Sequence, residues 1–231
     1  MRVLLCASAL VACLSSQALA LYDLQITEIW PGNFPNDSNG DNQTGDWFEL
    51  TNLGDMAWTS ADGTLYFDDS SPAVANADQM FGITSIAPGE SVIYVDDDLA
   101  LPALTLSIWH GLWDTPLTNA GKSVPQVGYY GGSGLGGGGD EVNVFLDTDA
   151  NLEISDIIDS EDYVDADSSG GQSWDVPNGI YSHPSYAVVT AANDNGNPST
   201  GTPGYIAAIP EPASLFLGCA GLGFVCLRRR K

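Results

Sequence analysis

The chain has 231 residues and a formal net charge of −24 at pH 7, with 30 acidic residues against 6 basic ones. Between residues 21 and 209 the only base is Lys122, so 29 acidic residues give this region a net charge of −28. A surface this negative repels phosphate, which excludes nucleic-acid binding. The apolar content of 44% argues against wholesale disorder, and the region is long enough to bury the core of one domain.

The N-terminus has the parts of a secretory signal peptide. Arg2 supplies a positive charge, residues 3–14 form an apolar run too short to span a bilayer, and Ala18-Leu19-Ala20 is an A-x-A cleavage site. We therefore predict a signal peptide at residues 1–20, export through the translocon, and cleavage between Ala20 and the next residue. The alternative is an uncleaved anchor helix.

The middle region alternates short runs rich in β-branched and aromatic residues with turns that contain Gly, Pro, Asn and Asp. It contains no cysteine, which excludes a disulfide framework and a thiolate metal site there. The pattern predicts one short helical stretch near residues 106–113 and strands at 24–29, 47–50, 65–67, 92–95, 142–146 and 186–189. Many short strands with frequent turns indicate an all-β domain, an antiparallel β-sandwich, at residues 21–208.

Several motifs of this region resemble, in the same order, those of a lamin tail domain. They are residues 26–29 (ITEI), 46–52 (DWFELTN), 86–95 (IAPGESVIYV), 138–145 (GGDEVNVF) and 201–204 (GTPG). The resemblance covers about residues 22–206. It implies an immunoglobulin-like β-sandwich that binds or tethers a partner and has no catalytic residues of its own. The chain departs from the family in a long loop at 33–45, a glycine run at 131–139 and an acidic stretch at 147–167.

The sequence presents no catalytic constellation. The region has two histidines, His110 and His183, and Ser133 does not lie in a nucleophile elbow. Carboxylates are so numerous that a glycosidase pair could always be chosen after the fact. The glycines at 134–139 fit G-x-G-x-x-G only formally, because they precede a strand instead of opening a helix. We therefore do not expect an enzyme, although a glycan hydrolase stays open.

Two of the six tryptophans bear on an alternative function. Trp109 and Trp113 are four residues apart, so one helical turn would place both on the same face. They could form a platform for sugar rings or dock the turn onto the domain, and docking is the favoured interpretation. Exposure of either one, or of Trp174, beside a cleft would favour a carbohydrate-binding module or a hydrolase acting on extracellular polysaccharide.

Calcium is the candidate cofactor. Oxygen ligands alternate along one acidic segment, comprising Asp147, Asp149, Asn151 and Glu153. Alternating carboxylate and amide oxygens are how a calcium loop begins. The rest of the loop is missing, because Leu152 stands where glycine is needed and Ile158 where a bidentate glutamate belongs. The alternatives are a polar turn between two strands and diffuse cation binding over the whole acidic surface.

The C-terminus carries a second signal with three parts. Pro210-Glu211-Pro212 precedes an apolar stretch at 213–227, for which we predict a transmembrane helix, and the chain ends in four bases, Arg228, Arg229, Arg230 and Lys231. This order resembles the PEP-CTERM sorting signal of Gram-negative bacteria, here at residues 209–231. The resemblance implies that an exosortase-type enzyme of the inner membrane recognises Pro-Glu-Pro and removes the tail. The alternative is a permanent single-span anchor.

These observations predict an exported, non-catalytic protein of the cell surface or exopolysaccharide matrix. Its β domain would bind or tether exopolysaccharide or surface proteins, with divalent cations bound in its acidic loops. The partners that the two signals imply are the export translocon and the exosortase-type processing enzyme.

Overall fold

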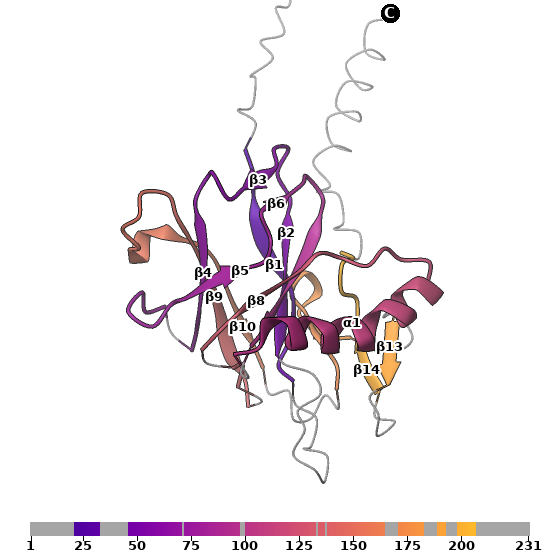
Figure 1. The fold of residues 1–231 in the computed structure, drawn as a ribbon. Coiled ribbons are helices and arrows are strands. Elements are labelled where there is room, and N and C mark those ends of the chain that lie inside the picture. Colours follow the sequence, from indigo (N-terminus) through magenta and orange to yellow (C-terminus); the bar gives the residue numbers. More distant parts are fainter. Residues whose placement is uncertain are drawn as a thin grey trace, which may run out of the picture.

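A computed structural model describes residues 21–32, 46–70, 72–97, 100–132, 134–136, 138–164, 171–182, 189–192 and 198–206. This part of the chain is mostly β structure, with helix α1 (Pro102–Asn119) lying across it (Figure 1). The predicted all-β class is confirmed. The strands are β1 (Leu24–Trp30), β2 (Trp47–Asn52), β3 (Trp58–Thr59), β4 (Thr64–Asp69), β5 (Asp78–Phe81), β6 (Ser85–Ile86), β7 (Ser91–Asp96), β8 (Val127–Tyr130), β9 (Asp140–Asp147), β10 (Ile157–Tyr163), β11 (Trp174–Asp175), β12 (Ile180–Tyr181), β13 (Val189–Ala192) and β14 (Pro198–Gly201). Two short 3-10 helices lie at Ile154–Asp156 and Val176–Asn178.

Ten of these strands form one continuous sheet in the order β10-β9-β4-β5-β8-β7-β2-β1-β11-β12. The sheet curls, because β5 pairs with β4 through its first residues and with β8 through its last ones. The curl brings β10 back to β1, where the Ile26 N–H donates to Asp159 Oδ2 at 2.6 Å. The sequence predicted an antiparallel immunoglobulin-like sandwich. The sandwich is not confirmed: the described strands form one large curled sheet, in which β7 and β8 run parallel, and two separate two-stranded sheets, β13-β14 and β3-β6.

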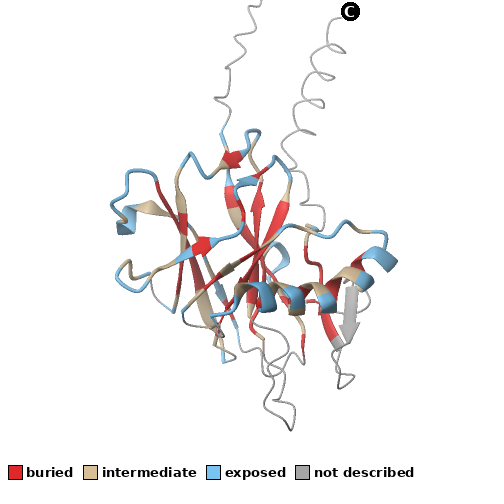
Figure 2. Ribbon diagram, in the orientation of Figure 1, coloured by how far each residue is buried: buried red, intermediate tan, exposed pale blue. Residues whose placement is uncertain are grey.

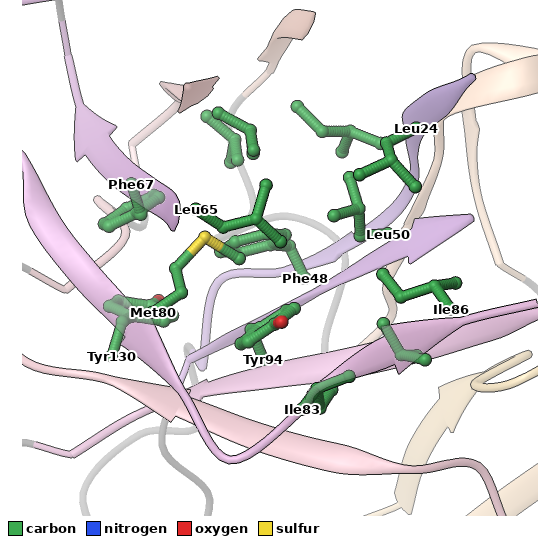
Figure 3. Packing of buried hydrophobic residues seen from close by; sticks show 14 of the residues in the cluster. Leu24, Phe48, Leu50, Leu65, Phe67, Met80, Ile83, Ile86, Tyr94 and Tyr130 are labelled. Carbon is green, nitrogen blue, oxygen red and sulfur yellow. The ribbon is translucent and has the colours of Figure 1, made fainter. Parts of the chain in front are cut away.

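The main hydrophobic core lies inside the curl. Side chains alternate along β2, so that Phe48 and Leu50 point inward, and Phe67 of β4 does the same from the opposite wall. The Phe48 and Phe67 rings stack with their centroids 5.4 Å apart, and Tyr94 and Tyr130 pack beside them. Figure 3 shows these side chains pointing toward one another from several strands. The core therefore joins β2, β4 and β7 at the centre of the domain.

A second hydrophobic cluster lies on the other face of β1, β2 and β7, beneath α1. Trp30 and Trp47 stack on each other with their centroids 6.1 Å apart, and Trp113 meets both edge-on. Ile93 and Val95 of β7 complete the sheet side of the cluster. Figure 2 shows exposed residues along the outer side of α1, and the buried residues of the helix include Trp109 and Trp113. The helix therefore covers the part of this sheet face that carries the cluster.

Two elements differ from the sequence prediction. The helix has 18 residues instead of about eight, and its buried residues recur every fourth position, at Thr105, Trp109, Trp113 and Leu117. This stripe of buried residues is narrower than the broad apolar face of a typical surface helix. The helix also contains Gly111 and Pro116, which disfavour a helix prediction. The acidic stretch at 147–167 contains strand β10, whose polar residues escape a test based on hydrophobic alternation. The predicted strand at 186–189 lies mostly outside the described residues.

Candidate functional site

The most unusual chemistry of the domain is a pair of buried glutamates on neighbouring strands. Glu28 of β1 and Glu49 of β2 are directly opposite each other in the ladder, beside an irregularity in β1 between Ile26 and Glu28. Along β2, Glu49 shares a face with Trp47, so it lies on the side of the sheet that α1 covers further along. Both glutamates are 1% exposed.

The two carboxylates hold the segment that follows β14. Glu28 Oε1 accepts hydrogen bonds from the Ser173 hydroxyl and from the Thr202 N–H, the latter at 2.7 Å. Glu49 Oε2 accepts a hydrogen bond from the Gly204 N–H at 2.6 Å. The pair therefore fastens the backbone of residues 202–204 to the centre of the sheet. We call this arrangement the glutamate clasp: Glu28, Glu49 and the two N–H groups that they bind.

Hydroxyl groups surround the clasp. The Thr27 hydroxyl lies 2.6 Å from Glu49 Oε1 and 2.7 Å from the Thr51 hydroxyl, which in turn lies 2.7 Å from that of Ser91. On the other side, the Ser173 and Ser182 hydroxyls are 2.9 Å apart. This network gives the carboxylates polar neighbours in the interior, where an unpaired polar group is costly.

Burial and mutual repulsion keep the pair protonated to unusually high pH. Burial raises the pKa of Glu28 to about 8, with a further contribution from the charge of Glu49 and opposition from the hydrogen bonds. Burial also raises the pKa of Glu49 to about 7. Lys122, the single lysine or arginine in the described part of the chain, lies over the Tyr205 ring and not between the carboxylates. The raised pKa values mean that the pair retains a proton, which lessens the cost of burying it.

A carboxyl pair with raised pKa values is also a common arrangement for acid–base catalysis. Here each glutamate is 1% exposed, and three of the four carboxylate oxygens already accept hydrogen bonds from this chain. The fourth, Glu28 Oε2, is buried and has no hydrogen-bond partner among the described residues. Substrate cannot reach groups enclosed in this way, so the geometry supports a structural role for the pair.

Further contacts fix the segment on both sides of the clasp. A Cβ on Gly201 would lie 2.9 Å from Glu28 Oε1, so only glycine lets this carboxylate come so close. Gly204 has φ of +78° and packs against the Pro125 ring. Lys122 Nζ lies 3.3 Å from the centroid of the Tyr205 ring, a cation–π contact. These contacts therefore hold the chain on the domain up to Tyr205, just before the predicted sorting signal.

The tryptophans predicted to dock or to bind sugar are mainly buried. Trp109 is 3% exposed and Trp113 0%, both in the cluster beneath α1, which confirms the docking interpretation. Trp174 is partly exposed and packs edge-on against Tyr181. Trp109 and Trp113 therefore do not form a platform for a sugar ring.

Asp147 is the buried last residue of β9, and the other candidate calcium residues, Asp149, Asn151 and Glu153, lie on the exposed turn that follows it. Asp147 Oδ1 accepts hydrogen bonds from the backbone N–H groups of residues 149, 150 and 151, and the Asn151 amide donates to Glu153 Oε1 at 2.6 Å. In the described residues, no three His, Cys, Asp or Glu side chains gather into a group that could hold a metal ion. The polar turn is therefore present as one of the predicted alternatives, and calcium at Asp147, Asp149, Asn151 and Glu153 stays a prediction.

The remaining residues that the sequence singled out do not lie together at one site. His110 pairs with Asp114 on α1, with Nδ1 2.9 Å from Oδ1, while His183 lies outside the described residues. The glycine run precedes β9 as expected, and its Leu135 N–H donates to Asp46 Oδ2 at 2.5 Å. The signal-cleavage and sorting residues also lie outside the described residues; they are Ala18, Ala20, Pro210, Glu211, Pro212, Arg228, Arg229, Arg230 and Lys231.

Sequence reasoning placed both clasp glutamates inside family-like motifs but assigned them no role. The available signal was a charged residue between apolar neighbours in two separate strands, at Glu28 and Glu49. In a half-buried strand that position can face solvent, so the pattern alone could not show that another segment covers it.

Comparison with known families identifies the C-terminus. Residues 208–231 match the PEP-CTERM protein-sorting motif, which confirms the resemblance inferred from Pro-Glu-Pro, the apolar stretch and the terminal bases. This motif marks proteins that are exported and sorted by exosortase to the cell surface. No curated protein and no solved structure matches the chain significantly. No helix within the described residues is long and apolar enough to cross a membrane, and the predicted helix at 213–227 lies outside them.

Proposed function

We propose that this chain is a non-catalytic protein of the cell surface or extracellular matrix, whose β domain serves as a binding or tethering module for exopolysaccharide or other surface proteins. The observation that carries the proposal is the PEP-CTERM motif, which begins at residue 208, two residues after the last described position. The glutamate clasp supports it, because Thr202 and Gly204 are fastened within six residues of that motif.

In this proposal the clasp defines where the domain ends and the processed tail begins. Tyr205 is the last ring held on the domain, through Lys122, and Pro210-Glu211-Pro212 follows a few residues later. Removal of the tail near Pro210–Pro212 would then leave a mature protein that has lost no part of its core. The short connection would also keep the domain close to the membrane while the exosortase-type enzyme acts.

The non-catalytic part of the proposal rests on two arrangements. The carboxyl pair with the most strongly raised pKa values among the described acids is enclosed, and the paired tryptophans of α1 are packed against the sheet. Neither arrangement offers a reactive surface to a sugar chain. Release of reducing ends from the exopolysaccharide of the source cells by the purified protein would contradict this part.

Mass spectrometry of the surface and culture fractions of the source cells tests the sorting step. We expect a mature species that lacks the basic residues 228–231 and ends near Pro210–Pro212. A surface species that retains the four C-terminal bases would instead indicate a permanent anchor and would overturn the processing part of the proposal.

The variant Glu211→Ala sharpens this test. If the processing enzyme reads Pro-Glu-Pro, we expect unprocessed full-length protein to accumulate in the membrane fraction. Ser214→Ala is the matched control, because it lies three residues further on and leaves Pro-Glu-Pro intact. Equal processing of both variants would show that Glu211 is not recognised.

A further inference from the structure

The first described residue, Leu21, is bound to the turn at Gly54–Met56 through backbone hydrogen bonds. Its N–H donates to Asp55 Oδ1 at 2.7 Å, and its C=O accepts hydrogen bonds from the N–H groups of Asp55 at 3.0 Å and Met56 at 3.4 Å. A Cβ on Gly54 would lie 2.1 Å from the Leu21 oxygen, so the turn that receives this residue needs glycine at 54. Leu21 is therefore a fixed part of the fold, although its side chain is 64% exposed.

The predicted cleavage site, Ala18-Leu19-Ala20, directly precedes Leu21 in the sequence. Hydrolysis of the Ala20–Leu21 amide breaks its C–N bond, adds the elements of water, and leaves a carboxylate on Ala20 and an α-amine on Leu21. The α-amine of a new N-terminus has a pKa of about 7.7–8.0, so most of it takes up a proton at pH 7. The N–H that faces Asp55 would then belong to an ammonium group.

We propose that export processing after Ala20 creates an ion pair between the α-ammonium of Leu21 and the carboxylate of Asp55, and that this pair locks the mature N-terminus onto the domain. The precursor has only a neutral amide at this position, so the pair forms only when the signal peptide is removed. The surroundings favour a cation. Asp23, the nearest other acid along the chain, accepts a hydrogen bond from the Gln25 amide, and residues 21–209 together carry a net charge of −28.

The first experiment identifies the mature N-terminus. Intact-mass measurement or N-terminal sequencing of the exported protein should show Leu21 as its first residue. A mature chain that begins at any other residue overturns the proposal. This result is independent of the C-terminal processing on which the proposed function rests, so the two ideas can fail separately.

The second experiment measures the ion pair in the whole mature chain. Protein comprising residues 21–231 is released from a cleavable fusion with either Leu21 or one additional glycine first, in the same detergent, and each form is made with Asp55 and with Asp55→Asn. The extra residue displaces the ammonium from the carboxylate. We expect it to lower the melting temperature by about 1–3 °C when Asp55 is present and to have almost no effect in the Asp55→Asn chain, a size typical of one surface ion pair.

The third experiment reads the charge directly and does not depend on stability. The pKa of the Leu21 α-amine, followed by NMR titration, should lie above the ordinary range of about 7.7–8.0 and return to it in Asp55→Asn. Asp162→Asn, an exposed acid of β10 with the same change of charge, is the matched control and should leave this pKa nearly unchanged. Equal shifts in both variants, or no interaction between the extra glycine and Asp55, would overturn the ion pair.

Discussion

Two groups of acidic side chains in this domain have similar chemistry and opposite surroundings. Glu28 and Glu49 are buried and lie opposite each other on the adjacent strands β1 and β2. They bind the backbone at residues 202–204. The turn at 148–153 is exposed, and Asp149 and the preceding Asp147 accept hydrogen bonds from its backbone. The pKa of each buried glutamate is raised strongly by burial. The position of an acid in the fold, more than the number of acids, therefore decides what it contributes.

The largest difference between the two groups should appear when the side chains are truncated. Glu49→Ala leaves the Gly204 N–H and the Thr27 hydroxyl without this acceptor, and Glu28→Ala does the same to the Thr202 N–H. We expect each to lower the free energy of unfolding by roughly 2–4 kcal/mol, since each buried donor without a partner costs about 1–3 kcal/mol.

Urea denaturation at pH 6, where the carboxyls are largely protonated, measures this loss. Glu153→Ala in the exposed turn is the matched control and should change the free energy of unfolding by less than about 0.5 kcal/mol. If the three variants are equally stable, the clasp does not hold the C-terminal segment.

The same comparison predicts how stability depends on pH. The unfolded chain releases the protons of these glutamates near the ordinary pKa of 4.5, while the folded chain keeps them until about pH 7 to 8. Folding therefore takes up protons in this window. The stabilising contribution is fully present below pH 4.5, and the free energy of unfolding falls as the pH rises through the folded values.

Melting temperatures between pH 4 and pH 9 at constant ionic strength test this sign. Glu28→Gln keeps an acceptor for the Thr202 N–H and removes the proton, so it should flatten the slope between pH 5 and pH 8. Glu153→Gln should leave the slope as it is, which separates the buried pair from the general repulsion of the acidic surface. A stability that rises over this window in the unaltered chain would contradict the pKa directions.

The sequence supported the fold where local pattern and burial agree. Strands β2 and β7 are rich in apolar and aromatic residues and are buried along their whole length, as strands of a sheet with two covered faces are. Both strands were predicted. Strand β10 was expected only as the second strand of a polar turn, because its ladder with β9, and not its hydrophobicity, defines it. The closing contact of Ile26 with Asp159 joins residues 133 positions apart, which no local pattern reveals.

The glutamate clasp was unpredictable for a related reason. Glu28 and Glu49 become neighbours only through the register of β1 and β2, and the segment that they hold, residues 202–204, reaches them only in the folded chain. The sequence shows two glutamates in strands, but the covering segment lies more than 150 residues away from them. Long-range pairing therefore carries the information that the motifs lack.

A smaller effect should follow from the contact between Lys122 and Tyr205. Lys122→Met keeps most of the apolar stem and removes the charge, so it should cost about 0.5–1 kcal/mol, the size of a partly exposed cation–π contact. Limited chymotrypsin digestion should then cut after Tyr205 faster than in the unaltered chain. Lys122→Arg retains a cation and is the control. Equal cutting of the two variants would show that the charge does not hold this ring.

Calcium should have the smallest effect, and it tests the exposed member of the comparison. Asp147 already accepts three backbone hydrogen bonds through Oδ1, so a bound ion would rely on Asp149, Asn151 Oδ1, Glu153, backbone carbonyls and water. Calcium loops of extracellular proteins have dissociation constants of about 10⁻⁴–10⁻³ M, so millimolar calcium should raise the melting temperature by only about 1–2 °C.

Two controls distinguish a calcium site in this turn from screening of the whole domain. Sodium chloride at the same ionic strength should not reproduce a site-specific shift, because it acts on all exposed charges together. Asp149→Asn should abolish a specific shift, whereas Glu28→Gln should leave it intact, because the clasp is enclosed and lies away from this turn. If sodium chloride reproduces the full effect of calcium, the ions bind diffusely to the acidic surface. The same follows if calcium has its full effect on the Asp149→Asn chain. If calcium and salt both leave the melting temperature unchanged, the turn is a polar connection between β9 and β10, and its acids keep the exported domain soluble.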